Sequence, residues 1–195
     1  MRIVGILLAA GRGSRFGGDK LRARLEDGTA IGVQAARNLK AALPESIAVV
    51  RPEDGELSRM LAATGIEVTP CPDAAVGMGA SLSHAVRARA DADGWIVALA
   101  DMPLIRPQTI LRIAAALGSG ARIAAPAFRG QRGHPVGFAA GLGKRLAALT
   151  GDAGARDIVR DEARQVVLVE VDDPGVLADI DTPAELERVT ARSGN

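Results

Sequence analysis

The sequence predicts an α/β protein built on one doubly wound, mostly parallel sheet, and three observations predict it. Its 195 residues suffice for one sizeable domain and are too few for two ordinary ones. Short apolar runs alternate along the chain with longer segments of helical period, which is the pattern of successive strand–helix–strand units. Two of these runs, 2–9 and 95–100, are apolar almost throughout, as expected for central strands that helices cover on both faces.

The strands are expected at the short apolar runs. The predicted strands are 2–9, 46–50, 66–70, 95–100, 122–127, 134–139 and 165–171. The turn-rich stretch FRGQRG joins the fifth strand to the sixth, so the two are candidates for a hairpin. Such a hairpin would form a small antiparallel part of the sheet.

The helices are expected at the longer segments between these runs. The predicted helices are 31–42, 54–64, 79–91, 107–117, 141–149, 153–163 and 182–191. The fourth opens with Pro107 in its first turn, where the missing N–H of proline costs no hydrogen bond. The last has Thr182 as N-cap and Pro183 directly after it, which is a typical helix start.

The composition excludes several classes of function. Lys and Arg number 24 against 23 Asp and Glu, so no net field recruits nucleic acid or an anionic membrane. Aromatic residues make up 2%, too few to bind single strands by base stacking. The lone Cys71 excludes an internal disulfide framework and a cysteine zinc site. No run approaches the ~20 apolar residues of a membrane span, so we expect a soluble cytoplasmic protein with neither nucleic-acid nor membrane partners.

A glycine-rich loop follows the first predicted strand, at 9–20 (AAGRGSRFGGDK). Ligands of doubly wound sheets bind where the central strands end, and glycine N–H groups can surround a phosphate there. The loop is neither a Walker A loop, because Asp19 follows Gly18, nor a dinucleotide fingerprint, because Phe16 replaces the third glycine. Arg15 and Lys20 remain as cations beside glycines, which favours triphosphate binding over a merely solvated loop.

A carboxylate, Asp101, follows the fourth predicted strand directly and precedes Met102-Pro103. Mg²⁺ typically takes one or two protein carboxylates together with substrate phosphates, so Asp101 is a candidate metal ligand. A second carboxylate could come from Asp179 or Asp181, just before the last helix. The alternative for these two is that either only caps that helix.

Six blocks, taken together and in order, resemble a known family. They are LAAGRGSRFGGDKL (8–21), GMGASL (77–82), LADMP (99–103), RGHPVGF (132–138), LTGDAGAR (149–156) and DIDTP (179–183). The chain resembles the MobA-like nucleotidyltransferases and, within them, the molybdenum cofactor cytidylyltransferases. The resemblance implies a Rossmann-like fold of the nucleoside-diphosphosugar transferase type. It also implies a single domain, 1–195, with an NTP-binding half at about 1–105 and an acceptor-binding half at about 106–195.

The resemblance also implies a set of site residues. Nucleotide binding falls to Leu8, Ala9, Ala10, Gly11, Gly13, Arg15 and Lys20, with Gly77, Met78, Gly79 and Ser81 holding base and ribose. The resemblance implies that Lys20, Arg15 and Asp101 are catalytic, and that Asp101 binds Mg²⁺ together with Asp179 or Asp181. Ala10 favours CTP, because guanylyl-transferring relatives usually read LAGG where this chain reads LAAG.

The implied reaction joins CMP to molybdopterin. The terminal phosphate of the pterin attacks the α-phosphorus of CTP and releases pyrophosphate, so catalysis is mostly positioning and charge neutralisation. The acceptor phosphate is already anionic and needs no general base. Arg132, Gly133 and His134 crowd one turn and are expected to contact the acceptor, the alternative being a plain hairpin turn. His84 is expected on a helix face.

Two other functions remain open. One is nucleotidyl transfer, from GTP or another NTP, to a different acceptor such as a sugar or polyol phosphate; the sugar-nucleotide branch usually has proline where Asp19 precedes Lys20. The other is a non-catalytic chaperone that passes molybdenum cofactor to a client molybdoenzyme. The presence of both Lys20 and Asp101 counts against the chaperone.

Overall fold

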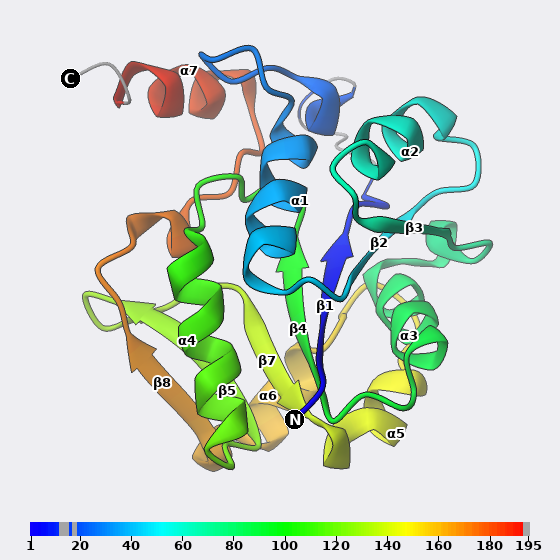
Figure 1. The fold of residues 1–195 in the computed structure, drawn as a ribbon, viewed down its shortest axis with the longest axis vertical. Helices are drawn as coiled ribbons and strands as arrows, with labels where there is room; N and C mark the ends of the chain where they lie inside the picture. The colour runs from blue at the N-terminus through cyan, green and yellow to red at the C-terminus, as the bar shows by residue number, and fades with distance from the viewer. Residues whose placement is uncertain (12–15, 17–18, 193–195) are drawn as a thin grey trace.

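A mixed sheet forms the centre of the protein, as Figure 1 shows for the computed structural model, which describes residues 1–11, 16 and 19–192. The strands found in this part of the chain are β1 (Ile3–Leu8), β2 (Ser46–Val50), β3 (Glu67–Pro70), β4 (Gly94–Leu99), β5 (Ile123–Phe128), β6 (Gln131–Arg132), β7 (Val136–Ala139) and β8 (Val166–Glu170). Their order is β3-β2-β1-β4-β7-β5, with β6 and β8 both paired to β5. The chain moves outward from β1 to β3 and then returns to β4, so strand order reverses between β1 and β4.

Only a small part of this sheet is antiparallel. Strands β1, β2, β3 and β4 pair in parallel, and so do β5 and β8. Strand β7 lies between β4 and β5 and runs antiparallel to both, while β6 forms a tight hairpin with β5. The predicted fold class is therefore confirmed, as is the antiparallel pairing of the segments 122–127 and 134–139.

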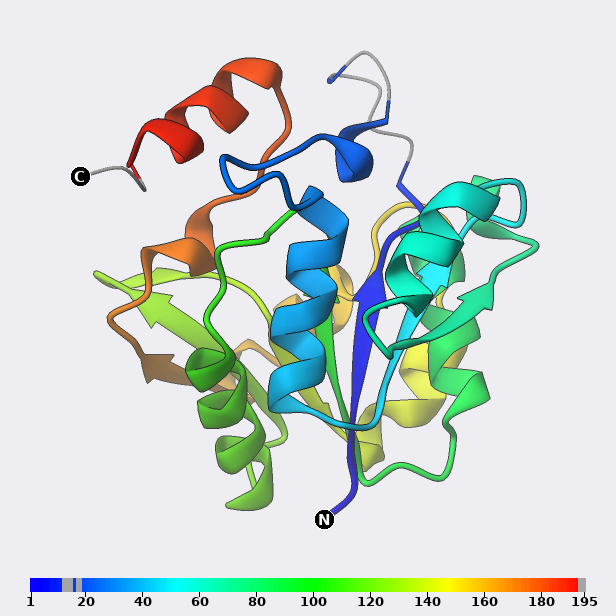
Figure 2. The ribbon, with the colours of Figure 1, turned by 45° about the horizontal axis from the view of Figure 1, so that its top comes forward.

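Helices cover both faces of the sheet in two layers (Figures 1 and 2). The helices α1 (Ile31–Ala42), α2 (Gly55–Ala62) and α4 (Pro107–Gly118) pack on one face. The helices α3 (Met78–Ala88), α5 (Gly143–Ala147) and α6 (Arg156–Asp161) pack on the other, and α7 (Pro183–Arg192) follows near the C-terminus. Strand β1 serves both cores, because Val4 and Ile6 enter one and Leu7 the other. The continuous apolar runs of the central strands are explained by this burial on both faces.

The predicted segments 141–149 and 153–163 differ most from the structure. The first divides into a 3₁₀ turn at Ala140–Leu142 and the short α5. The second shortens to α6, because Gly154 has a φ of 55° and its left-handed backbone cannot belong to a helix. The other predicted elements are present with ends shifted by a few residues at most.

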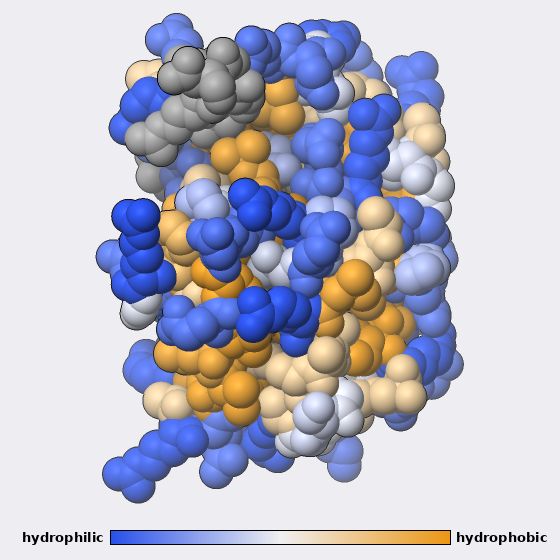
Figure 3. All heavy atoms as spheres, turned by 60° about the vertical axis from the view of Figure 1, so that its left-hand side comes forward, coloured by the Kyte–Doolittle hydropathy of each residue, from blue (hydrophilic) through white to orange (hydrophobic). Residues whose placement is uncertain are grey.

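Strand β8 forms one edge of the sheet, opposite the β3 edge. Its Val167 and Leu168 are exposed, as is Leu111 of α4. Figure 3 shows hydrophobic surface among polar groups on this side of the molecule. Within the described ranges, no helix combines the length and the hydropathy that crossing a membrane would require.

Candidate functional site

The two loops that were expected to carry the chemistry start side by side. Leu8 and Leu99 are register partners at the ends of β1 and β4, and the Ala100 N–H donates to the Leu8 carbonyl at 3.1 Å. The edge at which β1 and β4 end is called here the carboxyl edge. It coincides with the reversal of strand order, where ligands of such sheets bind.

The turn before β7 reaches the same edge because β7 runs opposite to β4. Val136 at the start of β7 pairs with Val97 near the end of β4, so the antiparallel register brings the preceding His134 level with Leu99 at the end of β4. Gly133 permits a close crossing, since a Cβ there would lie only 2.8 Å from the carbonyl carbon of Val176. The His134 N–H donates to the Val176 carbonyl at 2.9 Å, which holds the turn in place.

The segment before α7 is anchored to the carboxyl edge from the other end of the chain. Ile180 is fully buried, and its N–H donates to the carbonyl of Asp101 at 3.0 Å. Oε2 of Glu185 accepts from the Asp181 and Thr182 N–H groups at 2.9 and 2.8 Å, while Thr182 Oγ1 accepts from the Glu185 N–H at 3.3 Å. This is a capping box, so Thr182 is the N-cap of α7 as predicted. The Asp181 N–H donor and the other donors here lower the pKa of Glu185.

Lys20 joins the glycine loop to the two other segments. Its Nζ donates to Asp101 Oδ2 at 2.7 Å and to Asp181 Oδ1 at 2.8 Å. The side chains of Lys20, Asp101 and Asp181 are only 11%, 23% and 20% exposed. Burial alone would lower the pKa of Lys20, but the hydrogen bonds to both carboxylates outweigh it and raise the pKa above its usual value. Lys20 is therefore an ammonium at neutral pH.

The two carboxylates form a donor set suited to one divalent ion shared with a substrate. Asp101 Oδ1 is buried and has no hydrogen-bond partner among the described residues. In the part of the chain that the structure describes, no group of three or more His, Cys, Asp or Glu could hold a metal by itself. A pair of carboxylates without further protein ligands fits Mg²⁺ that also binds phosphates.

Asp179, the other candidate for the second carboxylate, lies elsewhere on this segment. It is exposed and lines a surface hollow together with Arg106 and Arg188. Asp181 is the acid that reaches Lys20 and thereby lies beside Asp101.

A cavity of about 230 Å³ opens at the carboxyl edge, where Leu8 and Leu99 line it. Its apolar wall includes Leu8, Leu99 and Phe138, and its polar side chains come from two segments, the turn before β7 and the start of α6. The full lining is Leu8, Met78, Leu82, Val97, Leu99, Arg132, Gly133, His134, Val136, Phe138, Ala153, Ala155, Arg156 and Val159. The structure thus brings Met78, predicted to bind nucleotide, into one cavity with Arg132, Gly133 and His134, predicted to bind acceptor.

His134 is held in the cavity as a neutral side chain. Burial lowers its pKa; the charges of Asp101 and Asp179 act in the opposite direction, and that of Arg132 acts in the same direction. Its Nδ1 is buried and has no hydrogen-bond partner within the described residues. Near pH 7 the neutral ring can therefore form one hydrogen bond to a ligand through Nδ1, but it brings no positive charge to the cavity.

Arg156 is the cavity residue that the sequence interpretation missed. It ends the block LTGDAGAR, begins α6 and lines the same cavity as Arg132 and His134. A glycine-rich turn that ends in a cation was the available signal. No role was assigned to it, because nothing local shows where that turn packs.

The block GMGASL packs directly against that turn. Gly77 has a φ of 137°, and a Cβ there would lie 2.5 Å from the Gly151 carbonyl oxygen. The Gly79 N–H donates to the same oxygen at 2.7 Å. Ser81 is only 3% exposed, and its hydroxyl donates to the Gly77 carbonyl at 3.5 Å. Two blocks about 70 residues apart therefore form one wall of the cavity.

The remaining predicted site residues lie along the start of the glycine loop. Ala9 and Ala10 are buried on opposite faces of the sheet, and Gly11 is exposed. Gly13 and Arg15 lie outside the described residues. His84, expected on a helix face, lies on α3 with Nε2 2.9 Å from Thr69 Oγ1.

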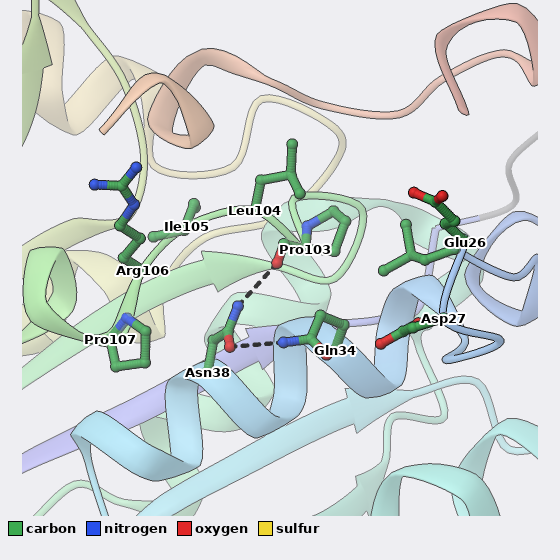
Figure 4. Close-up of a pocket in the computed structure, with 10 residues that line it drawn as sticks. Glu26, Asp27, Gln34, Asn38, Pro103, Leu104, Ile105, Arg106 and Pro107 are labelled. Atoms are coloured by element: carbon green, nitrogen blue, oxygen red, sulfur yellow. Dashed lines mark hydrogen bonds between the residues drawn. The ribbon is translucent and has the colours of Figure 1, made fainter. Parts of the chain in front are cut away.

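A second hollow, of about 550 Å³, lies on the α1 side of the loop that follows Asp101 (Figure 4). Asn38 of α1 donates to the Pro103 carbonyl at 2.8 Å, and Gln34 donates to Asn38 Oδ1 at 2.9 Å. Figure 4 shows the Asn38 amide pointing toward Pro103 and the Gln34 amide pointing toward Asn38. Helix α1 therefore positions the Asp101–Pro103 loop through a side chain that sequence reasoning did not single out.

Comparison with known proteins agrees with this geometry. The model of the MobA-like NTP transferase domain matches residues 5–167. The purine catabolism protein PucB of Bacillus subtilis (strain 168) is 28% identical over 197 residues, which cover 96% of this chain and 95% of PucB. The nicotine blue oxidoreductase of Paenarthrobacter nicotinovorans is also 28% identical, over 196 residues, which cover 96% of each protein.

Among solved structures, Rv0371c from Mycobacterium tuberculosis H37Rv superimposes with a TM-score of 0.83 at 29% identity, and the match covers 98% of both chains. A second structure of that protein, in complex with manganese, matches with a TM-score of 0.80 at 27% identity and covers 98% of this chain and 99% of that one. The likeness therefore extends over the whole fold.

Proposed function

Because this chain belongs to the MobA-like NTP transferase family, we propose that it transfers CMP from CTP to the terminal phosphate of molybdopterin and releases pyrophosphate. One observation carries the proposal: Lys20, Asp101 and Asp181 meet at the carboxyl edge, beside a cavity that contains Arg132 and Arg156. Nucleotidyl transfer needs a charge-neutralising group for a triphosphate next to a site for an anionic acceptor, and these residues supply both.

The transfer is a substitution at phosphorus. An oxygen of the acceptor's terminal phosphate forms a bond to the α-phosphorus of CTP, and the bond from that phosphorus to the bridging oxygen of pyrophosphate breaks. The attacking oxygen is already anionic, so no residue has to remove a proton. Lys20 supplies a positive charge to the triphosphate, and neutral His134 offers a hydrogen bond to the acceptor.

Asp101 and Asp181 are the residues that would hold Mg²⁺ in this reaction. When bound, the ion neutralises negative charge on the phosphates. The unpartnered Asp101 Oδ1 and the two-carboxylate donor set support this assignment, and the manganese bound by Rv0371c supports the use of a divalent ion. Asp179 is left with no proposed part in metal binding.

Both halves of the chain contribute residues to the proposed acceptor site. NTP binding is assigned mainly to about 1–105, through the loop that ends in Lys20. The acceptor is assigned to the cavity. Arg132 and Arg156 of its lining belong to the C-terminal half of the sequence, whereas Met78 belongs to the N-terminal half. A flat pterin can rest on the apolar wall and stack with an arginine, which compensates for the scarcity of aromatic residues.

Nucleotide choice tests the proposal most directly. With Mg²⁺ and molybdopterin, pyrophosphate release from CTP should exceed release from GTP by at least about tenfold, because the methyl group of Ala10 replaces the glycine of the guanylyl-transferring relatives. All four NTPs are assayed with and without molybdopterin. Equal rates, or a preference for GTP, would contradict the choice of CTP. Release that does not depend on molybdopterin would contradict the choice of acceptor.

Arg156 provides a test of the acceptor site. Replacing it with alanine should raise the KM for molybdopterin about tenfold or more, which is the usual cost of a lost charge-assisted hydrogen bond, and leave the KM for CTP nearly unchanged. Arg160 offers a matched control, because it lies on the same helix, is exposed and pairs with Asp157 at 2.8 Å. An unchanged KM for molybdopterin in Arg156→Ala would remove this arginine from the acceptor site.

A further inference from the structure

The ammonium of Lys20 occupies the place between the two carboxylates to which the proposed function assigns a divalent cation. Nζ lies 2.7 Å from Asp101 Oδ2 and 2.8 Å from Asp181 Oδ1. A cation bound between the carboxylates would draw on the lone pairs of these two oxygens as well as on the unpartnered Asp101 Oδ1. The same oxygen cannot give its full charge to an ammonium and to a metal ion at once, so the two cations exclude or weaken each other.

The ammonium and the divalent ion compete for the negative charge of the same two carboxylates. One ammonium between two carboxylates leaves a net charge of −1, whereas a divalent ion leaves none. Both carboxylates are largely buried, so their interactions are less screened than those of surface pairs. A free divalent ion therefore has to displace Lys20 from a well-formed site before it can bind both acids.

The backbone at both carboxylates is held by bonds that do not involve Lys20. The backbone of Asp101 is tied to the segment before α7 through the Ile180 N–H, and Asp181 is held by the bond from its own N–H to Glu185. Lys20, in contrast, reaches them at the end of a four-carbon stem from the 3₁₀ turn Lys20–Arg22. The ammonium can leave by rotation of this stem while the backbone of both acids stays in place.

We infer that Lys20 competes with the divalent cation as well as binding phosphate. By holding Asp101 and Asp181, its ammonium keeps their affinity for a free divalent ion low. The phosphates of the nucleotide attract the ammonium and release the carboxylates, so cation and nucleotide bind together and each raises the affinity for the other. The inference rests on the proposed function for the place of the nucleotide, but its first claim concerns the protein and the cation alone.

Binding of Mn²⁺ to the protein without added nucleotide tests this claim. Calorimetric titration should show that Lys20→Met binds Mn²⁺ at least about tenfold more tightly than the wild type, because the charge-assisted bonds of the ammonium no longer compete. Lys20→Arg keeps a cation at the site and should show no such gain. Lys144→Met is the matched control, since Lys144 is an exposed lysine on α5, and it should bind Mn²⁺ as the wild type does.

A further variant connects the gain to the carboxylates. Adding Asp181→Asn to Lys20→Met should remove the gain in Mn²⁺ affinity. Thermal unfolding establishes that each variant is folded, and Lys20→Gln replaces Lys20→Met if the latter is not. Equal or weaker binding by the neutral variant would overturn the competition, and so would an equal gain in Lys20→Arg. Pyrophosphate release by the wild type is measured separately, so a failure of the proposed function is distinguishable from a failure of the competition.

Discussion

Replacing Asp101 with asparagine will lower the rate of pyrophosphate release from CTP by at least about 10³-fold, with the fold intact. The substitution keeps the shape of the side chain but removes the charge that Lys20 contacts at 2.7 Å and that would hold the metal ion. This loss lies at the upper end of what a single charge-stabilising group contributes to catalysis. The measurement is the steady-state rate at saturating CTP, molybdopterin and Mg²⁺.

The neighbouring acid Asp179 provides the control for this prediction. It precedes α7 by a few residues, as Asp181 does, but it is exposed and lines a different hollow. Asp179→Asn should therefore retain a rate within about threefold of the wild type, whereas Asp181→Asn should lose activity as Asp101→Asn does. Retained activity in Asp101→Asn would remove Asp101 from the site. A larger loss in Asp179→Asn than in Asp181→Asn would reverse the assignment of the second carboxylate.

Replacing Lys20 with alanine will lower transfer by at least about 10²-fold. The Lys20 ammonium joins the end of the glycine loop to both carboxylates, and its raised pKa keeps it charged at neutral pH. Loss of one donor that stabilises developing charge costs a factor of this size. The rate is measured at saturating substrate, so that weaker CTP binding does not hide a change in kcat.

Lys40 and Lys144 complete the set of lysines in the chain and provide the comparison. Lys40 donates to the Pro44 carbonyl near the end of α1, and Lys144 is exposed on α5. Alanine at either position should leave the transfer rate unchanged within about twofold. If Lys20→Ala retains a rate close to that of the wild type, the glycine loop is a solvated loop and not a triphosphate site.

The positions of most elements were predictable because they depend on local properties. The apolar runs at 46–50 and 95–100 and the Thr182-Pro183 helix start are visible in a few consecutive residues, and the structure has them within one residue of the predicted places. Parallel pairing followed from the continuous apolar character of the central strands. The insertion of β7 between β4 and β5 was not predictable, because strand order depends on which distant segments pack together.

Several properties of the site depended on such distant contacts. Asp179 and Asp181 are the same residue type and both lie just before α7, but the burial of Ile180 and the cap at Glu185 place Asp181 at Lys20. Arg156 had no assigned role until the turn before α6 was seen to pack on Gly77 and Gly79. In each case the deciding interaction joins residues far apart in the sequence.

The fold class, the glycine loop that ends in Lys20 and the acid Asp101 at the end of a central strand could all be predicted from the amino-acid sequence. These features depend on the spacing of apolar residues and on the side chains that directly follow each strand, and both are visible within a few consecutive residues. The bridge from Lys20 to Asp101 and Asp181 became visible only in the folded protein, as did the cavity shared by Met78, Arg132 and Arg156. These contacts require three loops to converge on one edge of the sheet. The packing of the two cores, and not local propensity, determines where each loop ends.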